Sequence, residues 1–164
     1  MKKLIPLSVI AIVSTTAVLA GCSAASTPSS DIKSVVDRFL EEDANPTYDV
    51  LPGIVEYESG YSEENGSKIL VSVLYLEGYE GLSESLDAMK ENEVFMTSWT
   101  TIEKDFEEIQ YNLQQKLEAR LREKGFTPDE VDFGIDVMDS ETKKQSFFSI
   151  SDGSTYTDIF VQSN

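Results

Sequence analysis

The segment from residue 98 to residue 124 constrains the fold most, because it has the apolar periodicity of a long helix. Acidic residues gather near its start and basic residues near its end, as the helix dipole favours. Gly125 and then Phe126 follow, a pair typical of a Schellman cap. The apolar residues recur every three or four positions over about six turns; they are Trp99, Ile102, Phe106, Ile109, Leu113, Leu117 and Leu121. We therefore expect a helix over about 98–124, with Trp99 in the core.

The remaining apolar segments predict strands. "PGIVEYES" (52–59) alternates apolar and acidic residues, and "KILVSVLYLEG" (68–78) is apolar on both faces. Asn65-Gly66 lies between them and favours a tight hairpin turn. Three further strands follow the long helix, in "EVDFGIDVM" (130–138), "QSFFSIS" (145–151) and "STYTDIFV" (154–161), and Asp152-Gly153 predicts a second hairpin.

Two shorter helices complete the prediction. Apolar residues at helical spacing predict one over about 32–40, which should stop near Asn45-Pro46. Leu82, Leu86 and Met89 predict the other, over 81–92. Helices and hairpins are segregated along the chain, which indicates an α+β fold. We expect a two-layer sandwich, with a mostly antiparallel sheet of about five strands and the helices packed on one face.

The first 21 residues have the layout of a secretory signal peptide. Lys2 and Lys3 precede an apolar run from Leu4 to about Val13, and small residues follow. Pro6 and the polar residues 14–16 argue against a permanent membrane-spanning helix, which needs about 20 predominantly apolar residues. The fold prediction therefore leaves this segment out.

The end of the leader, Leu19-Ala20-Gly21-Cys22, resembles the lipobox of bacterial lipoproteins. The resemblance implies cleavage before Cys22, a diacylglyceryl group on its sulfur, and a protein anchored to the cell membrane on its extracytoplasmic side. Two acyl chains hold a soluble domain stably on a bilayer. Residues 23–30, "SAASTPSS", read as a flexible tether. We thus expect a signal peptide (1–21), an anchor and tether (22–30) and one domain (31–164).

Composition excludes several classes of function. The chain has 13 Lys and Arg against 30 Asp and Glu, a net charge of −17, which disfavours binding to nucleic acid and docking of the surface on anionic lipid. It has no histidine, so a Ser-His-Asp triad cannot form. Cys22 is the only cysteine, so an intrachain disulfide or a cysteine-rich zinc site is impossible. We predict no catalytic, cofactor-binding or metal-binding residues.

Calcium is the cofactor that the carboxylates suit best, because it prefers oxygen ligands. The EF-hand pattern is absent, however, and alternate carboxylates along a strand are most simply its solvent-exposed face. The candidate ligands are Asp129, Glu130, Asp132, Asp136, Asp139 and Glu141.

A small cell-envelope hydrolase is the alternative function. Ser140 and Lys143 match the SxxK nucleophile motif of penicillin-binding proteins and β-lactamases, but the companion S-D-N and K-T-G elements are absent. Ser30 and Lys33 match SxxK equally well, so the pattern is not specific. A pair of carboxylates acting on a polysaccharide is a second route to such an activity.

We expect instead a non-catalytic binding or interaction module at the cell envelope. Its contacts would be the membrane, through lipidated Cys22, and a protein partner, a basic one if the negative charge steers association. A purely structural envelope protein is a third interpretation. Tyrosines in the first hairpin supply aromatic anchors, and those at 57 and 61 are the first place to expect a binding edge; the four are Tyr57, Tyr61, Tyr75 and Tyr79.

Overall fold

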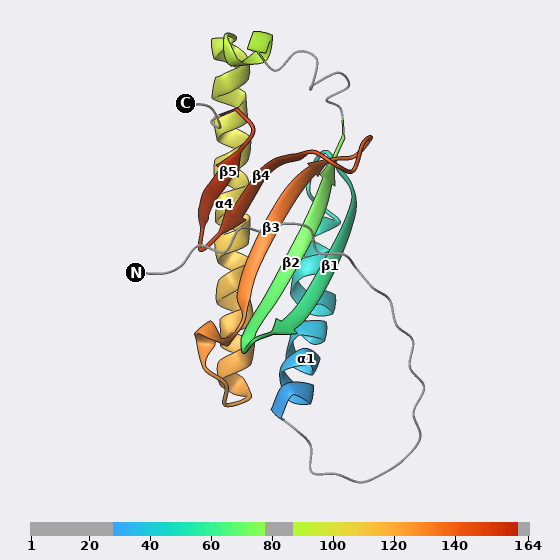
Figure 1. Cartoon of the computed structure of the whole chain (residues 1–164), viewed down its shortest axis with the longest axis vertical. Coiled ribbons are helices and arrows are strands. Elements are labelled where there is room, and N and C mark those ends of the chain that lie inside the picture. Colours follow the sequence, from blue (N-terminus) through green and yellow to red (C-terminus); the bar gives the residue numbers. More distant parts are fainter. Residues whose placement is uncertain (1–27, 78–86, 161–164) are drawn as a thin grey trace.

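The computed structural model describes residues 28–77 and 87–160 (Figure 1). The predicted leader, Cys22, Tyr79 and the first half of the predicted short helix (81–86) lie outside these residues. In the second half, residues 87–90 are helical. The helical elements are α1 (Pro28–Phe39), a π-helix (Leu40–Ala44), α2 (Asn45–Tyr48), α4 (Glu93–Glu123) and a 3-10 turn (Pro128–Glu130). The strands are β1 (Ile54–Glu64), β2 (Ser67–Leu76), β3 (Asp132–Asp139), β4 (Ser146–Ser151) and β5 (Ser154–Asp158).

The five strands form one sheet in the order β1-β2-β3-β4-β5. Neighbouring strands are antiparallel except β2 and β3, which run parallel in register from Ile69 opposite Asp132 to Leu76 opposite Asp139. A parallel pair needs a crossover connection, and α4 lies in it. The predicted α+β class and the mostly antiparallel five-stranded sheet are confirmed.

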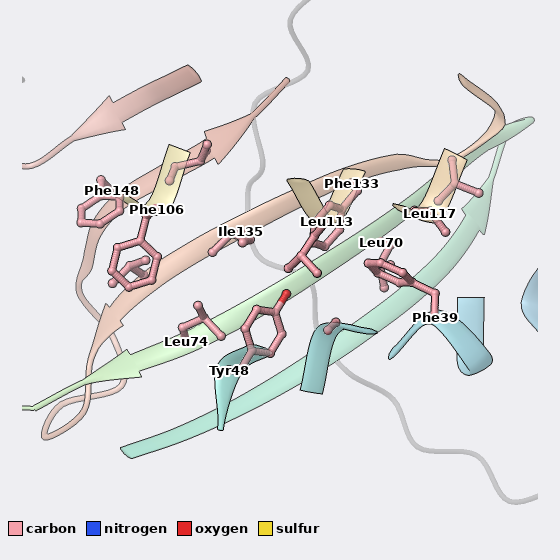
Figure 2. Close-up of a cluster of buried hydrophobic side chains, with 14 of the residues drawn as sticks. Phe39, Tyr48, Leu70, Leu74, Phe106, Leu113, Leu117, Phe133, Ile135 and Phe148 are labelled. Carbon is pink, nitrogen blue, oxygen red and sulfur yellow. The ribbon is translucent and has the colours of Figure 1, made fainter. Parts of the chain in front are cut away.

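Both α1 and α4 lie on the same side of the sheet, as Figure 1 shows. The core is the layer between them and the sheet (Figure 2). Phe39 of α1 meets Phe133 of β3 edge to face at 5.6 Å, and Leu113 and Leu117 of α4 are fully buried beside Leu70 of β2. Apolar side chains from both layers therefore hold the sandwich together.

Helix α4 begins at Glu93, earlier than the predicted start near residue 98. The side chain of Asn92 accepts hydrogen bonds from the amides of Val94 and Phe95, both at 3.1 Å, and so caps the first turn. At the other end Gly125 has φ +82°. The Phe126 amide donates to the carbonyl of Leu121 at 3.0 Å, which confirms the Schellman cap.

The prediction that the first helix stops near Asn45-Pro46 was wrong, because helical structure continues to Tyr48. A π-helix over Leu40–Ala44 separates α1 from α2 and breaks the regular hydrogen-bond register. Pro46 then falls in the first turn of α2, where its missing N–H needs no intrahelical partner.

Both predicted hairpins are confirmed. Asn65 and Gly66 have φ +52° and +84°, and Asp152 and Gly153 have +53° and +69°. Positive φ at both central residues is the requirement of a type I′ turn. Strand β1 extends to Glu64, beyond its predicted end at 59, whereas β5 ends at Asp158.

Trp99 belongs to the core, as predicted, and is 1% exposed. Its indole lies among four phenylalanine rings, with centroid distances of 6.0 Å to Phe95, 5.8 Å to Phe147, 5.5 Å to Phe148 and 4.7 Å to Phe160. Within residues 28–77 and 87–160, no helix is long and apolar enough to cross a bilayer.

Candidate functional site

The sheet face opposite α1 and α4 is the best candidate for a binding surface, and we call it the open face. Alternate residues of a strand point to opposite faces. Phe133, Ile135 and Val137 of β3 are buried toward the helices, so Asp132 and Asp136 point the other way. The cross-strand register extends this assignment to the neighbouring strands. The open face is lined by Glu56, Glu58, Gly60, Ile69, Val71, Val73, Tyr75, Asp132, Asp136, Met138 and Ser149.

An apolar strip on β2 runs along the middle of the open face, between two acidic rows. Ile69, Val71 and Val73 are half-buried there. Val73 lies in register with Glu58 of β1 on one side and with Asp136 of β3 on the other. A partner docking here would therefore meet carboxylates on both sides of an apolar contact.

Tyr75 stands at one end of the strip and is fixed by polar contacts. Its hydroxyl donates to Glu58 Oε1 at 2.6 Å. The Lys143 ammonium lies 4.7 Å from the centre of the Tyr75 ring and pairs with Glu56. Burial, together with the hydrogen bond to Glu58 and its charge, raises the pKa of Tyr75 to about 12. The phenol is therefore a neutral donor at physiological pH.

Asp136 is the most firmly positioned carboxylate of the open face. It accepts hydrogen bonds from the hydroxyls of Ser146 and Ser149 on β4, the latter at 2.8 Å. Two donors hold the carboxylate in one orientation, whereas Asp132 at the other end of β3 is exposed.

The calcium candidates do not converge on one point. Asp139 accepts hydrogen bonds from the Thr142 amide (2.8 Å) and hydroxyl (2.6 Å). Burial opposes ionisation of Asp139, but the hydrogen bonds from Thr142 and Glu141 outweigh it and lower its pKa. Glu130 pairs with Lys68 at 2.8 Å. Among the described residues, no group of three or more metal-ligating side chains is present.

The SxxK residues Ser140 and Lys143 lie in the turn after β3, as predicted, and each contacts a different group. The Ser140 amide donates to the carbonyl of Leu76 at 3.2 Å. The Lys143 amine contacts Glu56 and the Tyr75 ring. These contacts point the Lys143 amine toward the open face.

Tyr57 and Tyr61 pack toward the helix layer. Tyr57 meets Tyr48 at 5.3 Å and donates from its hydroxyl to Asp49 at 2.8 Å. The Tyr61 hydroxyl donates to Glu63 at 2.6 Å, and its ring packs against the core. The predicted aromatic binding edge at 57 and 61 is therefore turned inward, and Tyr75 is the described tyrosine of the first hairpin that lies on the open face.

One pair of converging carboxyl groups was not foreseen from the sequence. Glu103 of α4 faces Asp158 of β5, which is 5% exposed, and burial together with the charge of Asp158 raises the pKa of Glu103 to about 7. Glycosidases hold their two carboxyl groups about 5 to 9.5 Å apart so that the sugar or a water fits between them. Asp158 is instead buried and hydrogen-bonded to the Trp99 indole and the Phe160 amide, so a sugar does not reach this carboxylate in the folded structure. No sequence motif links Glu103 to Asp158, because they meet only through the packing of α4 on β5.

Comparisons with protein-family models, with curated proteins and with solved structures found no match to this chain.

Proposed function

We propose that this protein is a lipid-anchored, extracytoplasmic binding module whose open face holds a cationic partner protein. Cys22 would carry the anchor, and residues 23–27, which precede α1, would space the domain from the bilayer. The site has no catalytic task in this proposal.

The arrangement of the open face is the observation that carries the proposal. Carboxylates of β1 and β3 border the apolar strip of β2 on both sides. Apolar area supplies affinity, and a surrounding field of one sign selects partners of the opposite charge and speeds their encounter. The net charge of −17 adds to this selection.

Self-association through β1 is disfavoured by the same charges. Two copies of β1 paired antiparallel about Gly60 would place Glu56 of one copy opposite Glu64 of the other, and like charges directly opposite are destabilising. Lysine and arginine side chains at alternate positions of a partner strand would instead face Glu56 and Glu58. The charge pattern therefore favours a basic partner over a second copy.

Site-specific crosslinking in intact envelopes tests the proposal. A photo-crosslinking amino acid at Gly60 has room on the open face, because a Cβ there would meet nothing within 4 Å. The control position is Asn112, exposed on α4. We expect a partner of high isoelectric point to be captured from position 60 and not from position 112.

Charge variants sharpen this experiment. Glu58→Gln combined with Asp132→Asn should weaken capture from position 60, and added salt should weaken it further. Glu108→Gln, an exposed change on α4, is the matched control and should leave capture unchanged. Equal capture from both positions would contradict the proposal.

The small envelope hydrolase is the alternative to this binding role. A defined product released from peptidoglycan or polysaccharide by the purified protein, with no partner captured, would replace the binding proposal with that one.

A further inference from the structure

Helix α4 holds the β4–β5 hairpin through a series of polar side chains. Trp99 Nε1 donates to Asp158 Oδ1 at 3.3 Å, Glu107 Oε1 accepts from the Thr155 amide at 2.7 Å, and Gln110 Oε1 accepts from the Gly153 amide at 2.7 Å. The residue numbers on α4 increase along this series while those of their partners on the hairpin decrease, so α4 and β5 run antiparallel. The edge strand β5 is thus held by β4 on one side and by α4 beneath it.

Asp158 is the buried carboxylate of this series, at 5% exposed. Its Oδ1 accepts from Trp99 and, at 2.8 Å, from the Phe160 amide. Its Oδ2 is also buried, and no hydrogen bond to it from an N–H or hydroxyl group occurs among the described residues. A buried carboxylate oxygen without a donor is strongly unfavourable. Glu103 lies on the same face of α4, one turn after Trp99, which bonds Asp158, and one turn before Glu107, which bonds Thr155, so its carboxyl faces β5 beside Asp158.

Within residues 28–77 and 87–160, no lysine or arginine forms an ion pair with Glu103 or Asp158. The charged groups that act on Glu103 are Asp158 from β5 and Glu107 from the next turn of α4, both acidic. From β4 and the C-terminal side, the rings of Phe147, Phe148 and Phe160 surround the indole beside the pair. Two ionised carboxylates have no hydrogen to share, so the contact requires one bound proton.

We propose that a single proton shared between Glu103 and Asp158 holds β5 on α4, and that loss of this proton loosens β5 at physiological pH and above. Without it, Glu103, Glu107 and Asp158 face one another as three negative charges. Within the described part of the chain, the interactions that then hold β5 against this repulsion are its hydrogen bonds to β4 and the contacts of the hairpin with Gln110 and Trp99. Strand β5 becomes the first part of the sheet to open, and the edge of β4 becomes accessible.

The direction of the pH dependence follows from the titration of Glu103. Burial, the charge of Asp158, the hydrogen bond to it and the charge of Glu107 raise the pKa of Glu103 from 4.5 to about 7. A group whose pKa is higher in the folded state stabilises the fold fully below its unfolded pKa, and that stabilisation is lost as the pH rises through the folded pKa. Strand β5 is therefore held firmly below pH 4.5 and released progressively up to pH 7 and beyond.

Hydrogen exchange tests the proposal on the full chain in detergent micelles. We expect the protection factors of the β5 amides, corrected for the intrinsic pH dependence of exchange, to fall about tenfold between pH 5.5 and pH 8.5. Glu103→Gln retains a donor toward Asp158 and does not titrate, so it should keep β5 protected at pH 8.5. Glu108→Gln, an exposed change on the same helix, should lose β5 protection with rising pH as the wild type does.

Two results would overturn the proposal. One is β5 protection that is independent of pH in the wild type; the other is protection that falls equally in the wild type and in Glu103→Gln. If Glu103→Gln fails to fold, the carboxyl carbon of Glu103 in the wild type decides the matter by NMR titration. A midpoint near 7 supports the shared proton, and a midpoint near 4.5 rejects it.

Discussion

Gln110 accepts a hydrogen bond of 2.7 Å from the backbone amide of Gly153, and its own amide nitrogen donates to the carbonyl of Phe133 at 2.9 Å. The side chain is fully buried. It therefore joins the middle of α4 to β3 and to the tight turn between β4 and β5. Both partners are backbone groups. If Gln110 is lost, they cannot form another hydrogen bond unless a strand moves.

Replacing Gln110 with leucine should destabilise the fold by about 2 to 4 kcal/mol, because two buried backbone groups lose their partners. Urea unfolding followed by circular dichroism measures the change. Gln114→Leu, one turn later, is the matched control. The Gln114 amide donates only to Glu118 on the same helix, so its loss should cost less than about 1 kcal/mol. Equal costs for the two variants would show that Gln110 does not join the elements as described.

Gly125→Ala should destabilise the protein by about 1 kcal/mol, because an L-residue is strained at the left-handed conformation of the Schellman cap. The φ of Gly125 is +82°. Gly60→Ala is the control, since Gly60 lies in a strand and an added Cβ there would meet nothing within 4 Å. Thermal unfolding should show a lower midpoint for Gly125→Ala and none of this loss for Gly60→Ala. A comparable loss at both sites would count against the cap.

Arg120 ties α4 to the π-helix after α1, pairing with Asp43 and, at 2.8 Å, with Glu42. Arg120→Met should destabilise the fold by about 1 to 2 kcal/mol, because the part-buried Asp43 carboxylate loses its main partner. Arg122→Met removes only an exposed pair with Glu118 and should change stability by less than about 0.5 kcal/mol. Guanidinium unfolding compares the two variants. An equal loss of stability in the two variants would contradict a stabilising role for the contact between Arg120 and Asp43.

Cys22→Ala should abolish incorporation of radiolabelled palmitate into the protein, because the thiol is the proposed site of the lipid. Ser23→Ala, the adjacent change, should leave labelling intact. Metabolic labelling followed by immunoprecipitation of each variant gives the answer. Label retained in Cys22→Ala would contradict the anchoring proposal.

The elements with a strong period were predictable from the sequence. Seven apolar residues at helical spacing located α4, and the turns at Asn65-Gly66 and Asp152-Gly153 located both hairpins. The start of α4 was predicted too late because the stripe was counted from Trp99, whereas the cap at Asn92 begins the helix two turns earlier. Pro46 was taken as a stop, although a proline in the first turn of a new helix is tolerated.

The candidate site was less predictable than the fold. Alternation in β1 separates two faces, but it does not say which face the helices cover when tyrosines stand on one and carboxylates on the other. In the structure Tyr57 and Tyr61 face the helices, whereas Tyr75 lies on the open face, and the sequence pattern does not distinguish these two outcomes. The contact of Glu103 with Asp158 joins two ordinary positions of the sequence, and only the packing of α4 on β5 gives it chemical meaning.

The parallel pairing of β2 with β3 divides the chain into two units of similar construction. α1 with the β1–β2 hairpin forms one, and α4 with β3, β4 and β5 forms the other. Within each unit the contacts join residues close in sequence and form quickly, whereas the β2–β3 pairing joins residues that the crossover through α4 separates along the chain. We expect formation of the β2–β3 pair to limit the folding rate. The two units, produced as separate chains divided between residues 77 and 87, should assemble on mixing by forming this strand pair and by packing α1 and the first hairpin against α4 and β3.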